Sequence, residues 1–113
     1  MTLKAFFERY YQIICSGNLD DLEAFYHNGS AVMIGAKAQF ENMRKQFDFE
    51  MTLTKVELLS KQDDLLVVRD EMMIRGEKEG QNQEKSMQNI HSLAKEEGQW
   101  RIFSTASFPG LVG

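Results

Sequence analysis

Apolar residues near the start of the chain recur every three or four positions. The set begins after Thr2 and stops at Gly17, and it contains Leu3, Phe6, Phe7, Tyr10, Ile13 and Ile14. This spacing puts them on one face of an α-helix, with Thr2 as a candidate N-cap and Gly17 as a candidate C-cap. The pattern predicts a first helix with one buried face.

A second helix is predicted from Asn18 to the Asn28-Gly29 turn signal. Asp20 and Asp21 fall in its first turn, where the helix dipole favours acidic groups. Its expected buried side consists of Leu22, Phe25 and Tyr26. Helical spacing returns at residues 36–47, which predicts a third helix, and the short apolar run at residues 31–34 between them predicts a buried strand.

From residue 49 onward the hydrophobic period changes from helical to two. The predicted strands are residues 51–59, 65–75, 86–95 and 100–108. Polar, turn-forming segments join them, so each neighbouring pair is expected to form a hairpin. Three helices followed by an antiparallel meander predict an α+β arrangement, with the helices on one face of the sheet. No repeat or linker divides the 113 residues, so one domain is expected over residues 1–113.

Charge and composition narrow the partners. The net charge is −4, and the basic residues form no cluster beyond scattered pairs, so neither nucleic acid nor an anionic membrane surface is expected as a partner. No apolar run approaches the length of a membrane span, and residues 1–17 do not resemble an export signal, which favours a cytoplasmic location. Cys15 stands alone and is expected to serve packing.

Four short motifs carry a resemblance to a known superfamily. They are ERYY at residues 8–11, SGNLD at 16–20, AFY at 24–26 and EGQWRI at 97–102. The chain resembles the nuclear transport factor 2-like superfamily, in particular its SnoaL-like and ketosteroid isomerase-like branch. The resemblance implies a cone-shaped fold, in which three N-terminal helices pack on one face of a curved, mainly antiparallel sheet and enclose a mainly apolar pocket.

The ketosteroid isomerases of that branch use a helix-one tyrosine, a carboxylate base and a protonated aspartate. The resemblance places Tyr10 on the tyrosine, but it places Ile34 and Ile90 on the two acids. Because isoleucine neither takes a proton nor donates a hydrogen bond, this resemblance does not carry ketosteroid isomerase chemistry to the chain.

Asp70 is the one charged residue in a row expected to face the family's pocket. Alternation along the second predicted strand turns Leu66, Val68, Asp70, Met72 and Ile74 inward. A carboxylate among apolar neighbours is either a proton carrier with a shifted pKa or a group paired for packing, with Arg101 or Tyr10 as candidate partners. Both interpretations stay open at this point.

The predicted pocket lining is Tyr10, Ile34, Val68, Asp70, Met72, Ile90 and Phe103. The favoured function is binding of a small hydrophobic molecule. One alternative is a non-enzymatic dimerisation or partner-binding module, and another is an isomerase, cyclase or dehydratase with Asp70 and Tyr10 as catalytic residues. No cofactor motif is present, and the spacing of His27 and His91 matches no metal site.

A homodimer is expected through the outer face of the sheet, because helices cover only one face. The residues assigned to this interface are Met73, Met87, Leu93, Trp100 and Ile102, with Trp100 as the central anchor. Asn89 and His91 are assigned to the same outer face.

Overall fold

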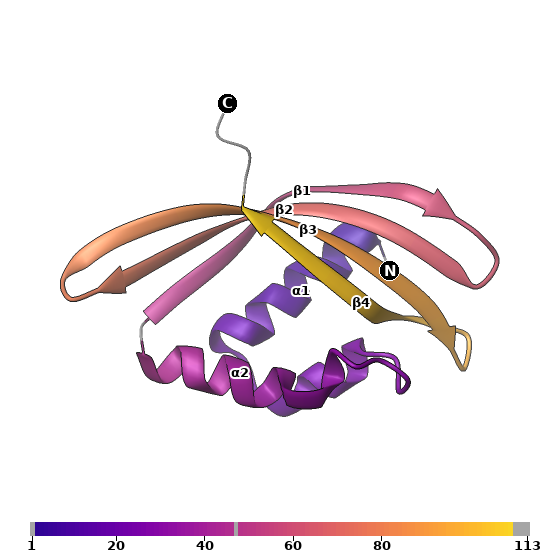
Figure 1. Cartoon of the computed structure of the whole chain (residues 1–113), viewed down its shortest axis with the longest axis horizontal. Coiled ribbons are helices and arrows are strands. Elements are labelled where there is room, and N and C mark those ends of the chain that lie inside the picture. The colour runs from indigo at the N-terminus through magenta and orange to yellow at the C-terminus, as the bar shows by residue number, and fades with distance from the viewer. Residues whose placement is uncertain (1, 47, 110–113) are drawn as a thin grey trace.

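The computed structural model describes residues 2–46 and 48–109, and it places three helices on one face of a curved sheet (Figure 1). The helices are α1 (Leu3–Ser16), the 3-10 helix η1 (Leu19–Phe25) and α2 (Met33–Gln46). The strands are β1 (Asp48–Lys61), β2 (Leu65–Lys78), β3 (Gln81–Glu96) and β4 (Gln99–Pro109). All neighbouring strands are antiparallel, in the order β1-β2-β3-β4. The predicted α+β fold is confirmed.

Helix α1 begins and ends at the predicted residues. The Thr2 hydroxyl accepts a hydrogen bond from the backbone N–H of Ala5, and the N–H of Gly17 donates to the carbonyls of Gln12 and Ile13. Its buried residues are Phe7, Tyr10, Tyr11, Ile13 and Ile14. Tyr11 joins the face that periodicity assigned to Tyr10, which puts two adjacent tyrosines between the helix and the sheet.

The segment between α1 and α2 departs from the predicted elements. The second predicted helix is a short 3-10 helix capped by Asn18, whose side chain accepts from the N–H of Asp20. The predicted strand at residues 31–34 is wrong, because these residues form a turn and the kinked start of α2, where Ile34 and Gly35 have non-helical backbone angles. A four-residue apolar run does not distinguish a strand from a turn that packs on the core. Phe47, the expected last residue of the third helix, lies outside the described residues.

The four strands are longer than predicted and are joined by tight turns. In two hairpins a glutamate and a glycine both have positive φ, at Glu79-Gly80 and Glu97-Gly98, as type I′ turns require. The register of β1 shifts twice, and that of β4 shifts once opposite Ser92 and Leu93. The shift in β4 leaves Phe103 as an extra residue, which changes the alternation along that strand.

The side chains facing the helices differ in part from those expected. The inward row of β2 is confirmed for Leu66, Val68, Asp70 and Met72, which are all buried. The opposite assignment on β3 is wrong, because Asn89, His91 and Leu93 are buried on the helix side. Their strand pairs explain this: Asp70 lies opposite Asn89, Val68 opposite His91 and Leu66 opposite Leu93, and cross-strand partners share a face.

The same finding removes most of the proposed dimer interface. Leu93 and Ile102 are fully buried in the core, and Met87 and Trp100 pack against it. Among the five assigned residues, only Met73 belongs to the outer row of its strand. The apolar character attributed to the outer face therefore belongs mainly to the core. Within the described residues, the structure has no helix long and apolar enough to cross a membrane.

Candidate functional site

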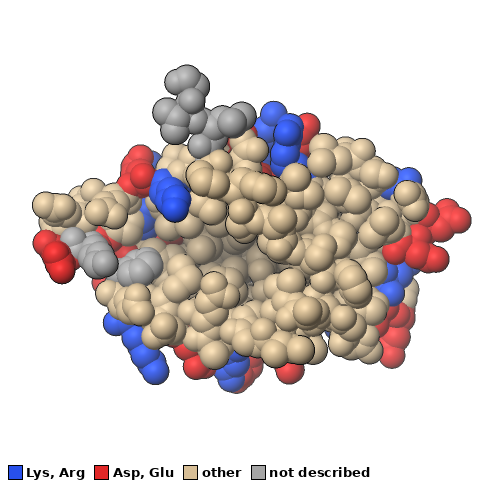
Figure 2. Space-filling view, viewed as in Figure 1, with Lys and Arg blue, Asp and Glu red and all other residues tan. Residues whose placement is uncertain are grey.

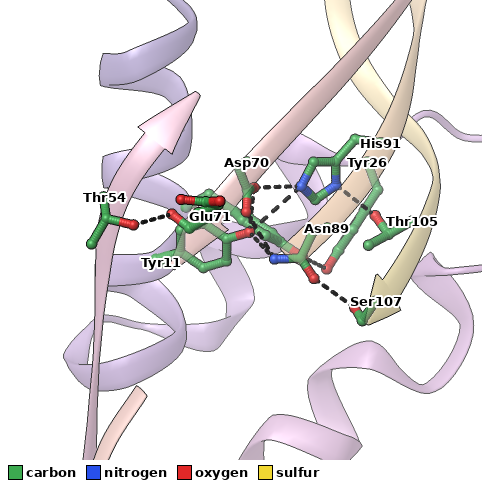
Figure 3. A network of polar contacts seen from close by, with 10 residues as sticks. Tyr11, Tyr26, Thr54, Asp70, Glu71, Asn89, His91, Thr105 and Ser107 are labelled. Carbon is green, nitrogen blue, oxygen red and sulfur yellow. Dashed lines mark hydrogen bonds and ion pairs between the residues drawn. The ribbon is translucent and has the colours of Figure 1, made fainter. Parts of the chain in front are cut away.

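A buried carboxylate occupies the centre of the sheet beneath α1. Asp70 is 1% exposed and is surrounded by polar side chains from α1 and β3 (Figure 3). The Tyr11 hydroxyl donates to its Oδ2 at 2.6 Å, and Nε2 of His91 lies 2.6 Å from the same oxygen. The Asn89 amide donates to Oδ1 at 2.8 Å. Both carboxylate oxygens therefore have partners within the protein.

A second group of contacts connects this cluster to β4. Nδ1 of His91 lies 2.9 Å from the Thr105 hydroxyl, and the Ser107 hydroxyl donates to Oδ1 of Asn89 at 2.7 Å. The Asn89 amide also donates to the Tyr11 hydroxyl at 3.1 Å. Below the His91 ring lies Phe7, stacked at a centroid separation of 4.5 Å. The cluster is thus fixed by hydrogen bonds on its edges and by an aromatic ring on one face.

The hydrogen-bond pattern assigns the protons in this cluster. An ionised carboxylate only accepts, so Tyr11, Asn89 and the Nε2–H of His91 all donate to Asp70. In a neutral His91 ring with its hydrogen on Nε2, Nδ1 accepts a hydrogen bond from the Thr105 hydroxyl, whereas a ring protonated on both nitrogens donates to that hydroxyl. A buried charge is tolerated where several donors meet it, and here three donors do.

Two further tyrosines pair beside the cluster. The hydroxyls of Tyr10 and Tyr26 lie 2.6 Å apart, and their rings meet edge to face. Burial raises the pKa of Tyr10 well above its ordinary value, and its neighbour Tyr26 adds to the shift. Burial also raises the pKa of Tyr26 and, together with the negative charge of Asp70, that of Tyr11. The three phenols therefore stay protonated and serve as neutral hydrogen-bonding groups.

A cavity of about 240 Å³ borders the cluster between α1, α2 and the sheet. Its polar lining consists of Tyr10, Tyr11, Tyr26, Gln39, Asn89, His91, Thr105 and Ser107. Its apolar lining consists of Ile14, Val32, Ala36, Phe40, Met51 and Met72. The face over β4 and α2 is largely uncharged and is hollowed between the two layers, with the charged residues at its margins (Figure 2).

Two larger hollows lie elsewhere on the surface. One of about 740 Å³ is near Cys15 and the β2–β3 hairpin, and one of about 1050 Å³ is between η1 and the β3–β4 hairpin. Charged side chains border both, such as Arg44 and Arg75 in the first and Asp20 and Arg101 in the second. Neither contains a buried polar cluster like that around Asp70, so we take the smaller cavity as the candidate site.

The residues predicted to line the pocket divide into two groups. Tyr10 and Met72 line the cavity, Asp70 lies behind its polar wall, and Val68 is fully buried in the core. The other three are exposed: Ile34 by 81%, Ile90 by 37% and Phe103 by 44%. Ile34 sits at the kink of α2, Ile90 belongs to the outer row of β3, and Phe103 is the extra residue of β4.

Seven polar residues of the site were not assigned to it from the sequence: Tyr11, Tyr26, Gln39, Asn89, His91, Thr105 and Ser107. One signal for β3 was present, since Met87 and Leu93 alternate with Asn89 and His91, and large apolar residues usually mark the buried row. The candidate partners of Asp70 also differ from those found. Arg101 pairs with Glu96 at 3.1 Å, and Tyr10 bonds to Tyr26.

The cluster has little capacity for metal binding or proton transfer through Asp70. Within residues 2–46 and 48–109, no group of three or more His, Cys, Asp or Glu side chains could hold a metal ion. Asp70 is 1% exposed and does not line the cavity, so a substrate there does not meet its carboxylate, which already accepts from three neighbours. The arrangement is suited to holding neighbouring hydroxyls in fixed orientations.

Comparison with known proteins identifies the family. The family described as "Anti-sigma-I factor RsgI9, C-terminal domain" matches residues 6–108, which cover nearly the whole described fold. The chain belongs to this family. Curated proteins gave no match.

Comparison with solved structures shows that this member of the RsgI9 C-terminal domain family has the nuclear transport factor 2-like fold. A Mycobacterium tuberculosis protein of unknown function has a TM-score of 0.82 and 14% identity, with 97% of this chain and 71% of that chain covered. An NTF2-like protein with a cystatin-like fold from Novosphingobium aromaticivorans has a TM-score of 0.74 and 11% identity, with 93% and 77% covered. The β subunit of benzoate 1,2-dioxygenase from Burkholderia mallei has a TM-score of 0.76 and 11% identity, with 96% and 88% covered. These identities establish the fold alone.

Proposed function

We propose that this domain binds a small, mainly apolar molecule in the cavity between α1, α2 and the sheet. The observation that carries the proposal is the combination of a 240 Å³ cavity with a polar wall whose members are already fixed by buried hydrogen bonds. Ligand sites generally combine an apolar lining with a few convergent polar groups, and this cavity is slightly smaller than their usual range of about 300 to 1,000 Å³.

Catalysis by Asp70 and Tyr10 is the weaker alternative. A general base must reach the substrate proton, whereas Asp70 is 1% exposed and lies behind the residues that line the cavity. A tyrosine with a raised pKa is a poorer proton donor than an ordinary one, which counts against Tyr10 as an acid. A binding role needs neither group to react.

The family name suggests where such a pocket would act. RsgI9 is described as an anti-sigma-I factor, and this family is its C-terminal domain. A regulator of that kind needs an input signal, and a pocket that binds without reacting is suited to receive one. We therefore infer that the ligand is a signal, and that the domain reports its presence to the rest of the protein.

Occupation of the cavity can be tested with toluene as a probe. Isotope-labelled methionine methyl groups of Met51 and Met72 line the cavity, so their NMR signals should shift saturably as toluene is added. Ala36→Leu fills part of the cavity from α2 and should abolish the shifts. Ala38→Leu, on an exposed position of the same helix, is the matched control and should preserve them. Unchanged methyl signals in the wild type would refute a ligand cavity.

A homodimer through the outer sheet face stays a second proposal, with different residues. Ile90 and Phe108 are exposed by 37% and 48% and lie close together, because Ile90 pairs with Ala106 and Phe108 with Gln88. Arg69, which pairs with Glu57, and Glu71, which accepts from Gln88, make the rest of this face polar. Sedimentation equilibrium of the wild type and Ile90→Asp would decide, since only a dimer through this face would dissociate in the variant.

A further inference from the structure

The hydrogen bonds in the polar wall of the cavity run in defined directions from donor to acceptor. These directions follow from the carboxylate of Asp70 at the centre of the cluster. Asp70 accepts from Tyr11 and from His91, so the hydrogens of these two groups point away from the cavity. The Ser107 hydroxyl gives its hydrogen to Asn89, and with His91 neutral and protonated on Nε2 the Thr105 hydroxyl gives its hydrogen to Nδ1 of that ring. Each of these hydroxyl oxygens is left with lone pairs and no hydrogen to offer.

The β4 part of this wall therefore accepts hydrogen bonds from a ligand, whereas the exposed Gln39 amide on α2 can both donate and accept. Thr105 and Ser107 both line the cavity from β4, and their oxygens stand side by side on the inward row of that strand. A hydroxyl has one hydrogen and two lone pairs, so a hydroxyl that has already donated can still accept from a ligand. A ligand group facing Thr105 and Ser107 must bring its own hydrogen.

The opposite requirement applies at the tyrosine pair. One of the Tyr10 and Tyr26 hydroxyls donates to the other, which leaves the second hydroxyl with an unused hydrogen. Among the described residues, neither hydroxyl has another hydrogen-bond partner. Besides the exposed Gln39 amide, the cavity thus offers a donor at the tyrosine pair and acceptors at Thr105 and Ser107, a combination that a ligand hydroxyl can satisfy because it both donates and accepts.

An anionic ligand does not suit this wall. No lysine or arginine is among the described residues that line the cavity, and the carboxylate of Asp70 lies directly behind the wall. A carboxylate ligand would place its lone pairs against those of Thr105 and Ser107, and it would lose its water without gaining a cation in return. The same lone pairs pose no obstacle to an uncharged alcohol.

The volume limits the size of the ligand. An apolar cavity of about 150 Å³ in another protein holds one benzene molecule. The 240 Å³ here is therefore enough for a single six-membered ring with a short substituent. The aromatic ring of Phe40 and the side chains of Met51 and Met72 supply apolar contacts for such a ring.

We propose that the ligand is an uncharged compound of single-ring size that carries a hydroxyl group, and that the cavity discriminates against carboxylates of the same shape. This inference rests on the proposed binding function. It adds to it the chemical class of the ligand and the physical basis of the selection, which is the orientation of the Thr105 and Ser107 hydroxyls by Asp70.

Three probes with the same aromatic ring separate the effects of ring size, hydroxyl group and negative charge on binding. They are toluene, benzyl alcohol and benzoate. Titration of each into the wild type, followed by the methyl signals of Met51 and Met72, gives three dissociation constants. Benzyl alcohol should bind at least about tenfold more tightly than benzoate, because the anion is desolvated against a wall of lone pairs. If benzoate binds as tightly as benzyl alcohol, the proposed ligand class is refuted while the binding function survives. If no probe binds, both fail.

Two variants test the cause of the selection. Thr105→Val removes an acceptor. It should raise the dissociation constant of benzyl alcohol by about three- to tenfold and leave that of toluene unchanged. Ser104→Ala, on the outer row of the same strand, is the control and should change neither constant. In Asp70→Asn the dissociation constants of benzyl alcohol and benzoate should lie within about threefold of each other. The reason is that an amide both donates and accepts, so it no longer fixes which way the hydrogen bonds of its neighbours point.

The protonation assigned to His91 can be measured directly. Nitrogen-15 chemical shifts of its imidazole should show a hydrogen on Nε2 and a bare Nδ1. A ring protonated on both nitrogens would turn the Thr105 hydrogen toward the cavity and would overturn the proposal. This measurement, like the probe series, uses the wild-type chain and does not depend on whether the Asp70→Asn variant folds.

Discussion

His91 contacts Asp70 diagonally across the β2–β3 pair, with its Nε2 2.6 Å from Oδ2, while Asn89 occupies the position directly opposite. Two successive inward positions of β3 thus serve one carboxylate. The pleat places such diagonal neighbours on the same face, so the arrangement follows from the register and needs no distortion of either strand. Tyr11 completes it from the helix layer and joins the two layers through a hydrogen bond to Asp70.

Removing the charge of Asp70 should destabilise the domain. Asp70→Asn leaves three neighbours oriented toward a group that can no longer accept from all of them, and we expect a loss of about 1 to 3 kcal/mol in the free energy of unfolding. Urea denaturation measures this loss. Asp64→Asn, on an exposed residue of the β1–β2 turn, should change stability by less than about 0.5 kcal/mol. A variant as stable as the wild type would show that the cluster does not stabilise the fold.

The tyrosines should resist ionisation as long as the protein is folded. The sequence contains three tyrosines, and all three line the cavity, so the ultraviolet absorbance of tyrosinate reports on this site alone. Their raised pKa values predict no ionisation of the native protein near pH 10, where tyrosines of the urea-unfolded chain titrate. A tyrosine that titrates near pH 10 in the folded protein would contradict the buried arrangement.

The same shifts determine how stability depends on pH at the alkaline end. A pKa that is higher in the folded state means that the native protein holds protons which the unfolded chain loses above about pH 10. Stability should therefore be unaffected by these groups below that pH and should fall above it, by up to about 1.4 kcal/mol per pH unit for each tyrosine. Tyr26→Phe retains the ring and should reduce the slope.

The Arg44 side chain should contribute more to the free energy of unfolding than the side chain of its exposed neighbour Lys45. Its guanidinium donates to the carbonyls of Ile13 and Ile14 at the end of α1, where the Gly17 N–H also donates to Ile13. We expect Arg44→Ala to lower the free energy of unfolding by about 1 to 3 kcal/mol, since two hydrogen bonds from a charged donor are lost. Lys45→Ala is the control. Equal effects of the two variants would mean that the contact between α2 and α1 is not stabilising.

Substitutions at Gly35 test the backbone conformation at the kink of α2. Its φ of +82° lies in the left-handed region, and a Cβ added there would meet no atom within 4 Å. Any loss of stability in Gly35→Ala therefore comes from the backbone conformation and should be about 1 to 2 kcal/mol. Gly35→Asn should lose less, because asparagine tolerates this region better. Thermal melts would show the order Gly, Asn, Ala, and a different order would argue against a left-handed residue at this point.

The sequence predicted the elements better than it predicted which side chains face the site. Periodicity located α1 and all four strands because each has a long, regular pattern and a turn signal at its end. It did not distinguish a 3-10 helix from an α-helix at residues 19–25, since both begin with the same cap and bury similar residues. The turn at residues 31–34 is short and apolar, and such a run carries no period.

Which side chains of β3 face the helices depends on how β3 pairs with its neighbouring strands. The local sequence pattern does not predict that pairing. The resemblance to the superfamily placed Ile90 in the pocket, and alternation along the strand then assigned His91 and Asn89 to the wrong face. A single-residue error of this kind exchanges every side chain of a strand between the two faces. In β4 the extra residue Phe103 makes strict alternation fail altogether, so that Ile102 and Thr105 both face the helices.

That irregular point on β4 has a consequence for self-association. β4 is an edge strand, and the carbonyls of edge strands can pair with another chain. Here the N–H of His27 donates to the carbonyl of Ile102, and the Ser30 hydroxyl donates to that of Phe103. Tyr26 also forms a parallel bridge to Ile102, so the loop from Tyr26 to Ser30 covers this part of the edge like a short additional strand. Substitutions that loosen this loop should therefore be recognised first by aggregation of the domain, before any change in its cavity.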